Sequence, residues 1–185
     1  PELDGGRFPA KRVVGDTLAV WADLLRDGHD TLAAVILYRP EGEAAWREAP
    51  MRLFDNDRWL GHVPLTENTR YRYTVEAWTD VFASWRADTL KKRQAGQDLA
   101  IDLLEGRDLL AATAARAAGT DRELLNRLLD AFEREDAAGR AEIMLSRLLA
   151  QAMARWPDRR GATRYGRELE LVVDRPLARF AAWYE

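Results

Sequence analysis

The residue types that most often carry catalysis are few and scattered in this chain. Histidine occurs only at His29, in a turn-like stretch, and at His62, in a strand-like one. Serine occurs only at Ser84 and Ser146, and neither lies in the G-x-S-x-G pattern of a hydrolase nucleophile. Cysteine is absent, which excludes thiol catalysis, thiolate metal sites and disulfides. We therefore predict no catalytic residue.

Metal and phosphate motifs are missing as well. The two histidines lack metal-ligand spacing, so we expect no metal site. The DGG at 4–6 is not followed by the glycines or the G-K-[ST] of a phosphate loop. The DND at 55–57 offers two carboxylates but lacks the rest of a calcium loop, and it is read as a solvated turn. No cofactor is predicted.

Sugar chemistry is the remaining class with suitable residues. A glycosidase needs an acid in an apolar setting and a second carboxylate several ångströms away, but none of the 31 acidic residues stands out. The substrate-binding residues are therefore unknown. Tryptophans on or beside strand-like runs have two interpretations: they fill a core, which we favour, or they stack against sugars. These residues are Trp21, Trp46, Trp59 and Trp78.

The composition of the chain limits the classes of binding partner to be expected. The net charge of −3, without a dense Lys/Arg block, argues against nucleic-acid binding. No apolar run approaches 18 residues, so no membrane helix is expected. A hydrophobic fraction of 47% is ordinary for a globular protein with a real core. The lack of cysteine suits the cytoplasm.

Strand patterns occupy the first 80 residues. The run from Thr17 alternates with Leu18, Val20, Ala22 and Leu24 on one face, and the run from Thr31 is apolar on both faces, as in a central strand. Further strands are expected from Asp57 and over 69–78. Turn-like segments separate these runs, which is typical of a sandwich or barrel.

Helical spacing begins at Asp80. Helices are predicted up to Gly96, and from about Asp98 to Ala118 with an interruption at Gly106. Further on, Thr120 with Glu123 resembles a capping box in front of a stripe of leucines and Phe132. Asp136 is expected to cap a last helix, which carries Leu145, Leu148, Leu149, Ala152 and Trp156 up to Pro157. This makes a bundle of three or four helices.

Strand character then returns at 168–174. Residues 1–80 and 167–185 together match the ~100 residues of an immunoglobulin-like sandwich. We therefore predict an α+β fold, in which an immunoglobulin-like β-sandwich (1–80 plus 167–185) carries an inserted helical bundle (81–166). Two consecutive domains are the less economical alternative, because they leave the last strand without a partner. The returning strand is expected to pair with TRYRYTVEAW at 69–78.

Three segments carry a resemblance to a known family: RYRYTVEAWTDVFASWRADTLKKRQAGQD at 70–98, IDLLEGRDLL at 101–110 and LELVVDRPLARFAAWYE at 169–185. They resemble the N-terminal region of the α-1,4-glucan:maltose-1-phosphate maltosyltransferases, in glycoside hydrolase family 13. The last segment is the most specific, and the helices over 120–155 add little.

The resemblance implies a parent enzyme with a catalytic (β/α)-barrel after residue 185, which transfers maltosyl units from α-maltose 1-phosphate to α-1,4-glucans with retention. It places the nucleophile and acid/base in that barrel, so this chain alone is expected not to be an enzyme. It also implies a homodimer. Phe180, Trp183 and Tyr184 would pack at the junction with the barrel, although folding back onto the sandwich remains the alternative. The first residue, Pro1, and this apolar C-terminus both fit a chain that continues.

Three functional classes stay open. The leading one is a non-catalytic architectural and dimerisation module. The alternative is a carbohydrate-binding module that contacts α-glucan through exposed tryptophans. The third, a stand-alone protein-interaction domain, requires a reading frame that ends near Glu185.

Overall fold

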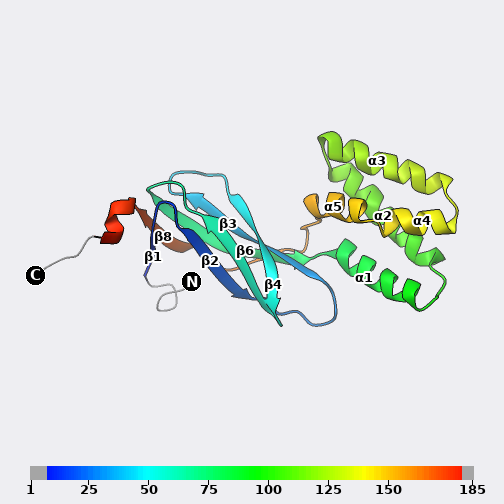
Figure 1. The fold of residues 1–185 in the computed structure, drawn as a ribbon, viewed down its shortest axis with the longest axis horizontal. Helices are drawn as coiled ribbons and strands as arrows, with labels where there is room; N and C mark the ends of the chain where they lie inside the picture. The colour runs from blue at the N-terminus through cyan, green and yellow to red at the C-terminus, as the bar shows by residue number, and fades with distance from the viewer. Residues whose placement is uncertain (1–7, 181–185) are drawn as a thin grey trace, which may run out of the picture. The chain divides into compact units, whose positions relative to one another are not determined.

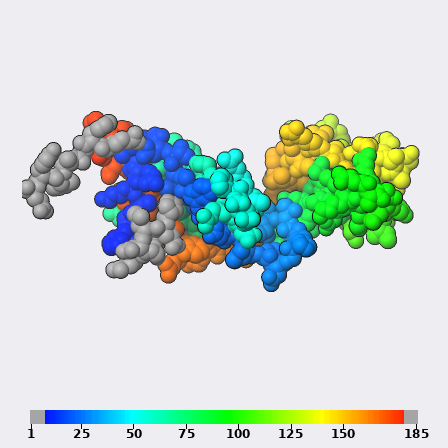
Figure 2. Space-filling model, turned by 60° about the horizontal axis from the view of Figure 1, so that its bottom comes forward, coloured from blue at the N-terminus to red at the C-terminus, as the bar shows by residue number. Residues whose placement is uncertain are grey.

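A computed structural model describes residues 8–180 of the chain, with the side chains of Arg179 and Phe180 left out (Figure 1). The chain divides into two compact units, which we call the β unit and the helical unit. The helical unit comprises His29–Thr31 and Thr79–Gly161, and the β unit contains Leu32–Trp78 with segments from both ends of the chain. In Figure 2 the orange residues from the C-terminal part lie against the blue residues from the N-terminal part. The β unit is therefore built from segments far apart in sequence.

The β unit is an eight-stranded sheet. Seven strands follow the order β1-β8-β6-β3-β4-β5-β2, and the short β7 pairs with β6. All pairs with a defined register are antiparallel except β1 with β8, which is parallel. The strands are β1 (Ala10–Val13), β2 (Thr17–Asp23), β3 (Leu32–Pro40), β4 (Arg47–Asp55), β5 (Arg58–Pro64), β6 (Arg70–Thr79), β7 (Thr163–Arg164) and β8 (Leu169–Asp174), and a short 3-10 helix, η1 (Pro176–Phe180), follows.

The returning strand pairs as predicted. β8 runs antiparallel to β6, with Leu171 opposite Tyr71 and Leu169 opposite Tyr73. On its other side β8 pairs with β1, from Ala10 opposite Leu171 to Val13 opposite Asp174. The sequence did not reveal β1, because this strand has only four residues, AKRV. Only the first and the last of them are apolar and buried, which is too few for a recognisable alternation.

The sheet is nearly closed around one core. Inward side chains of the seven strands on the main path form a single apolar cluster, which joins the two ends of that path. Its buried members are Ala10, Leu18, Val20, Ala34, Ile36, Ala49, Met51, Val63, Leu65, Tyr71, Tyr73, Leu171 and Val173. The immunoglobulin-like form of this sheet stays a prediction.

Two strands match and extend the sequence patterns. β3 is buried on both faces, as predicted: Ala34 and Ile36 belong to the main core, and Val35 and Leu37 form a second cluster with Trp78. β4 was missed, because Pro50 lies within it and its pairing with β5 shifts between Leu53 and Asp55.

The helical unit contains five helices, so the predicted three or four is wrong. They are α1 (Val81–Gln94), α2 (Ala100–Arg116), α3 (Gly119–Arg134), α4 (Ala137–Met144) and α5 (Arg147–Arg155). The last predicted helix is two helices, since the chain breaks at Leu145 and Ser146 then caps α5 by accepting from the Leu149 amide at 3.1 Å.

Of the two helix caps predicted from the sequence, one is confirmed. Asp136 caps α4 as predicted, accepting from the Gly139 amide at 2.9 Å. The capping box at Thr120 and Glu123 is wrong: α3 already begins at Gly119, before Thr120, and its N-cap is Ala118, which provides no side-chain cap. Thr120 therefore lies inside the first turn.

The predicted interruption at Gly106 is also wrong, because α2 runs through it. A Cβ at this position would lie 2.3 Å from Cζ2 of Trp85, so glycine allows the indole to pack directly on the α2 backbone. The Trp85 indole N–H donates to the Asp102 carbonyl at 2.8 Å. This contact joins α1 to α2.

The leucine stripe of α3 faces the helical core as predicted. Leu125 and Phe132 are buried in it, and Leu124, Leu128 and Leu129 pack against them. On α5 the stripe is narrower than predicted, since Leu149 and Ala152 are fully buried but Leu148 is 52% exposed. The helical unit thus has a core of its own.

Candidate functional site

The scattered histidines and serines do not form a catalytic group. Ser84 accepts from the Thr31 amide and donates to the Asp80 carbonyl, so its hydroxyl stabilises the start of α1. Ser146 is a helix cap, and His29 and His62 are exposed in different units. Over residues 8–180 no three His, Asp or Glu side chains lie together as metal ligands.

The DND turn has a structural role. Asn56 adopts a positive φ of 46°, and the Asp57 carbonyl accepts from the Leu24 amide at 2.9 Å. Asparagine tolerates this left-handed conformation better than most residues. The turn connects β4 to β5 in a hairpin.

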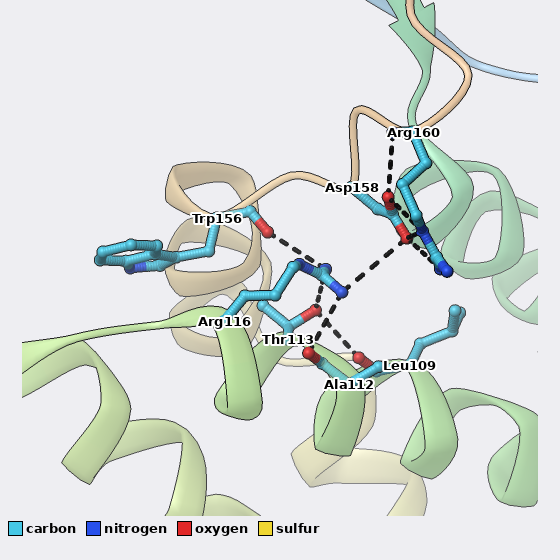
Figure 3. Close-up of polar contacts among 7 residues, drawn as sticks. All are labelled: Leu109, Ala112, Thr113, Arg116, Trp156, Asp158 and Arg160. Atoms are coloured by element: carbon cyan, nitrogen blue, oxygen red, sulfur yellow. Dashed lines mark hydrogen bonds and ion pairs between the residues drawn. The ribbon is translucent and has the colours of Figure 1, made fainter.

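A cluster of polar contacts lies where the chain leaves α5 (Figure 3). Arg116, at the end of α2, donates to the Ala112 carbonyl at 3.1 Å and the Thr113 hydroxyl at 3.0 Å. It also donates to the Trp156 carbonyl at 3.3 Å and lies 3.9 Å from a carboxylate oxygen of Asp158. A cation at a helix C-terminus satisfies carbonyls that have no partner within the helix. Arg116 therefore fixes the exit segment to α2.

Asp158 is held on its other side by Arg160. The guanidinium donates to both carboxylate oxygens, at 2.6 and 3.0 Å, and the Arg160 amide donates at 3.1 Å. The side-chain hydrogen bonds from Arg160, followed by that of its amide, lower the pKa of Asp158 to about 2. This carboxylate is ionised at neutral pH.

A second carboxylate, Asp121, joins α3 to α5. It accepts from Arg155 at 2.5 and 2.8 Å and from the Trp156 indole N–H at 2.9 Å. The bonds from Arg155, then that from Trp156, lower the pKa of Asp121 to about 2. A glycosidase acid needs a raised pKa, so Asp121 and Asp158 serve the helical fold rather than proton transfer.

The four strand tryptophans divide by exposure. Trp78 is buried against Val35 and Leu37, and Trp59 packs against the main core, so the core interpretation holds for both. Trp46 is partly buried and has two guanidinium groups over its ring, Arg39 at 4.3 Å and Arg164 at 5.8 Å from the ring centroid. Such cation–π contacts give this indole partners within the β unit.

Trp21 is the exception. It is 45% exposed, and its ring meets Phe54 edge to face, with centroids 4.9 Å apart. Phe54 is 61% exposed, and sequence reasoning did not identify it. The alternation of Leu18, Val20 and Ala22 already places Trp21 on the opposite, outward face of β2.

The predicted interdomain junction falls outside the described side chains. Phe180 ends η1, but its side chain is not described, and Trp183 and Tyr184 lie beyond residue 180. Leu177, earlier in η1, is 73% exposed. Among the described residues, no helix is long and apolar enough to cross a membrane.

Comparison with known proteins gives one consistent match. The family "Alpha-1,4-glucan:maltose-1-phosphate maltosyltransferase, domain N/S" matches residues 1–175. This chain is also similar to three proteins named alpha-1,4-glucan:maltose-1-phosphate maltosyltransferase. It is 45% identical to the one from Rhodospirillum rubrum, 42% to the one from Myxococcus xanthus and 42% to the one from Chlorobaculum tepidum. Each alignment covers 100% of this chain but only 29%, 29% and 28% of the relative. The chain thus spans less than a third of their length.

Proposed function

Because the chain belongs to the domain N/S family of the alpha-1,4-glucan:maltose-1-phosphate maltosyltransferases, we infer that it is a non-catalytic architectural and dimerisation module of such an enzyme. The enzyme would transfer maltosyl units from α-maltose 1-phosphate to α-1,4-glucans. The observation that carries this proposal is the family match over residues 1–175, in a chain that covers only 29% of the length of the Rhodospirillum rubrum relative.

The side chains support the absence of catalysis in this region. Ser84 and Ser146 are engaged at helix starts, and the two carboxyls with the most depressed pKa, Asp121 and Asp158, are saturated by arginines. A retaining glycosyl transfer needs a nucleophilic carboxylate and a protonated acid about 5 Å apart. We propose that both residues belong to a C-terminal catalytic barrel.

The architectural part of the proposal concerns the β unit. We propose an immunoglobulin-like sandwich interrupted by a helical insertion over 81–166. The common core of seven strands supports the sandwich, and the pairing of β6 with β7 and β8 supports the insertion. Phe180, Trp183 and Tyr184, which follow β8, would pack against the barrel.

The dimerisation part of the proposal has surface support in the helical unit. Ile101 and Leu104 lie one turn apart on α2 and are 75% and 54% exposed. Subunit contacts commonly bury such aliphatic side chains. We also expect the enzyme to be cytoplasmic, which the lack of cysteine supports.

Two measurements test this proposal. The 185-residue chain, mixed with α-maltose 1-phosphate and glycogen, should release no phosphate above the blank, whereas the full reading frame should release it. Release by the chain alone, surviving further purification, would refute the non-catalytic assignment. In the full-length protein, Ile101→Asp with Leu104→Asp should halve the mass measured by light scattering, and Leu148→Asp serves as the exposed-leucine control.

A further inference from the structure

The outer face of β2, β5 and β4 carries an exposed aromatic pair, Trp21 and Phe54. Across these strands, Val20, Gly61 and Met51 lie side by side and face the core. The next row, Trp21, Leu60 and Arg52, therefore faces outward.

This outward row has a buried floor. Leu60 is only 7% exposed although it faces away from the main core. Trp21 lies beside it on β2, and Phe54, from the irregular end of β4, contacts Trp21 edge to face. The Trp21 ring thus has Leu60 on the neighbouring strand and Phe54 at its edge, and the two rings keep 45% and 61% of their own surface exposed. We call Trp21, Phe54 and Leu60 the aromatic ledge.

Polar side chains flank the ledge along the same face. His62 stands opposite Ala19 in the row on one side, and Arg58 stands opposite Asp23 in the row on the other. Arg58 donates to Asp23 at 2.9 Å, and both side chains are more than half exposed. Arg52 belongs to the ledge row itself. Planar groups able to bond hydroxyls thus lie on both sides of exposed rings.

We propose that the aromatic ledge is an α-1,4-glucan binding site. A glucose ring has an apolar C–H face that stacks on an aromatic ring, and hydroxyls around its edge that pair with arginine, histidine and carboxylate groups. The ledge offers both features in this arrangement. A protein partner is the alternative occupant, since aromatic residues and arginine are also enriched at protein interfaces, and the oligomeric mass of the full-length protein distinguishes the two.

The identity of the sugar rests on the proposed function, since the relatives are named for an α-1,4-glucan. A ledge of one exposed tryptophan and one phenylalanine gives weak binding to a single chain end. A branched glucan presents many chains at once, and tethering raises the local concentration of acceptor ends. The module would thereby hold the polymer near the catalytic part of the enzyme.

Affinity electrophoresis of the 185-residue chain in gels containing glycogen tests the site, and maltoheptaose titration followed by amide NMR locates it. Wild-type protein should be retarded by glycogen, and maltoheptaose should shift signals of Trp21, Phe54 and Arg52. Trp21→Ala should weaken binding at least about tenfold, as expected when one aromatic contact is lost. Leu53→Ser and Trp46→Ala are the matched controls and should bind like wild type. Circular dichroism melts confirm that each variant is folded.

Two outcomes would overturn the inference. One is the absence of saturable binding by folded wild-type chain, and the other is unchanged binding by Trp21→Ala. If Trp21→Ala instead changes only the oligomeric mass of the full-length protein, the ledge is a protein contact and the glucan site is wrong. Phosphate release by the full-length enzyme is scored separately. Turnover without binding by this chain leaves the proposed function intact and refutes the glucan site alone.

Discussion

Leu171 lies directly opposite Tyr71 across the antiparallel pair of β8 and β6, and each side chain is only 1% exposed. Their neighbours Val173 and Tyr73 are buried in the same core. The chain after the helical unit therefore supplies core residues to a sheet that begins before it.

Truncation of Leu171 should destabilise the β unit. Leu171→Ala leaves a cavity beside Tyr71 and is expected to cost about 2–5 kcal/mol of the free energy of unfolding. Leu177→Ala, at a leucine 73% exposed in η1, should cost almost nothing. Urea denaturation followed by tryptophan fluorescence measures both. Equal small effects for the two variants would show that β8 is not part of the folded sheet in solution.

Removal of the helical unit should leave a folded β unit. Ala77 on β6 pairs with Thr163 on β7, so the two ends of the cut are already neighbours in the sheet. Replacing residues 79–161 with a Gly/Ser loop of about four residues makes a hairpin of ordinary length. We expect a strand-rich circular dichroism spectrum and one cooperative thermal transition. A non-cooperative melt would contradict the independence of the β unit.

Gly106→Ala should destabilise the helical unit even though alanine is the better helix former. At an exposed helical position this change gains about 0.5–1 kcal/mol. Here the new Cβ meets the Trp85 indole, and we expect a net loss of about 1–3 kcal/mol from overpacking. Chemical denaturation followed by the helical signal at 222 nm measures it. In a Trp85→Leu background the loss should shrink, and a full-sized loss there would exclude the proposed contact as its cause.

Asp121 should make the helical unit sensitive to acid. Arg155, then Trp156, lowers its folded pKa from 3.8 to about 2. Stabilisation is therefore fully present above pH 3.8 and is lost as the pH falls through about 2. Asp121→Asn should lower stability at neutral pH, and its difference from wild type should shrink below pH 3.8 and vanish once the pH is below about 2.

The matched control for this titration is Asp130→Asn, on the same helix at an exposed position. Urea unfolding of both variants, followed by circular dichroism over the acid range, gives the comparison. A difference between Asp121→Asn and wild type that stays constant down to pH 2 would show that the Arg155 pair does not depress this pKa.

Local patterns determined much of the fold. The alternation over 69–78 and 169–173 placed Tyr71, Tyr73, Leu171 and Val173 in one core, and the Asp136 cap followed from short-range hydrogen bonding. The leucine stripe of α3 likewise follows from helical periodicity. These features depend on neighbours within a few residues along the chain, so the sequence reveals them directly.

Sequence patterns were less informative where the local structure depends on residues far away in the chain. Gly106 looked like a helix break, because nothing in its own segment reveals the Trp85 indole that needs the space. The parallel pairing of β1 with β8 depends on which edge of the sheet is free once β6 has paired. The aromatic ledge is a mixed case. Alternation alone turns Trp21 outward, but only the register of β2 and β4 on β5, with the irregularity after Leu53, brings Phe54 to its edge. The direction of a side chain is a local property of its strand, whereas the tertiary structure decides which other residues that side chain contacts.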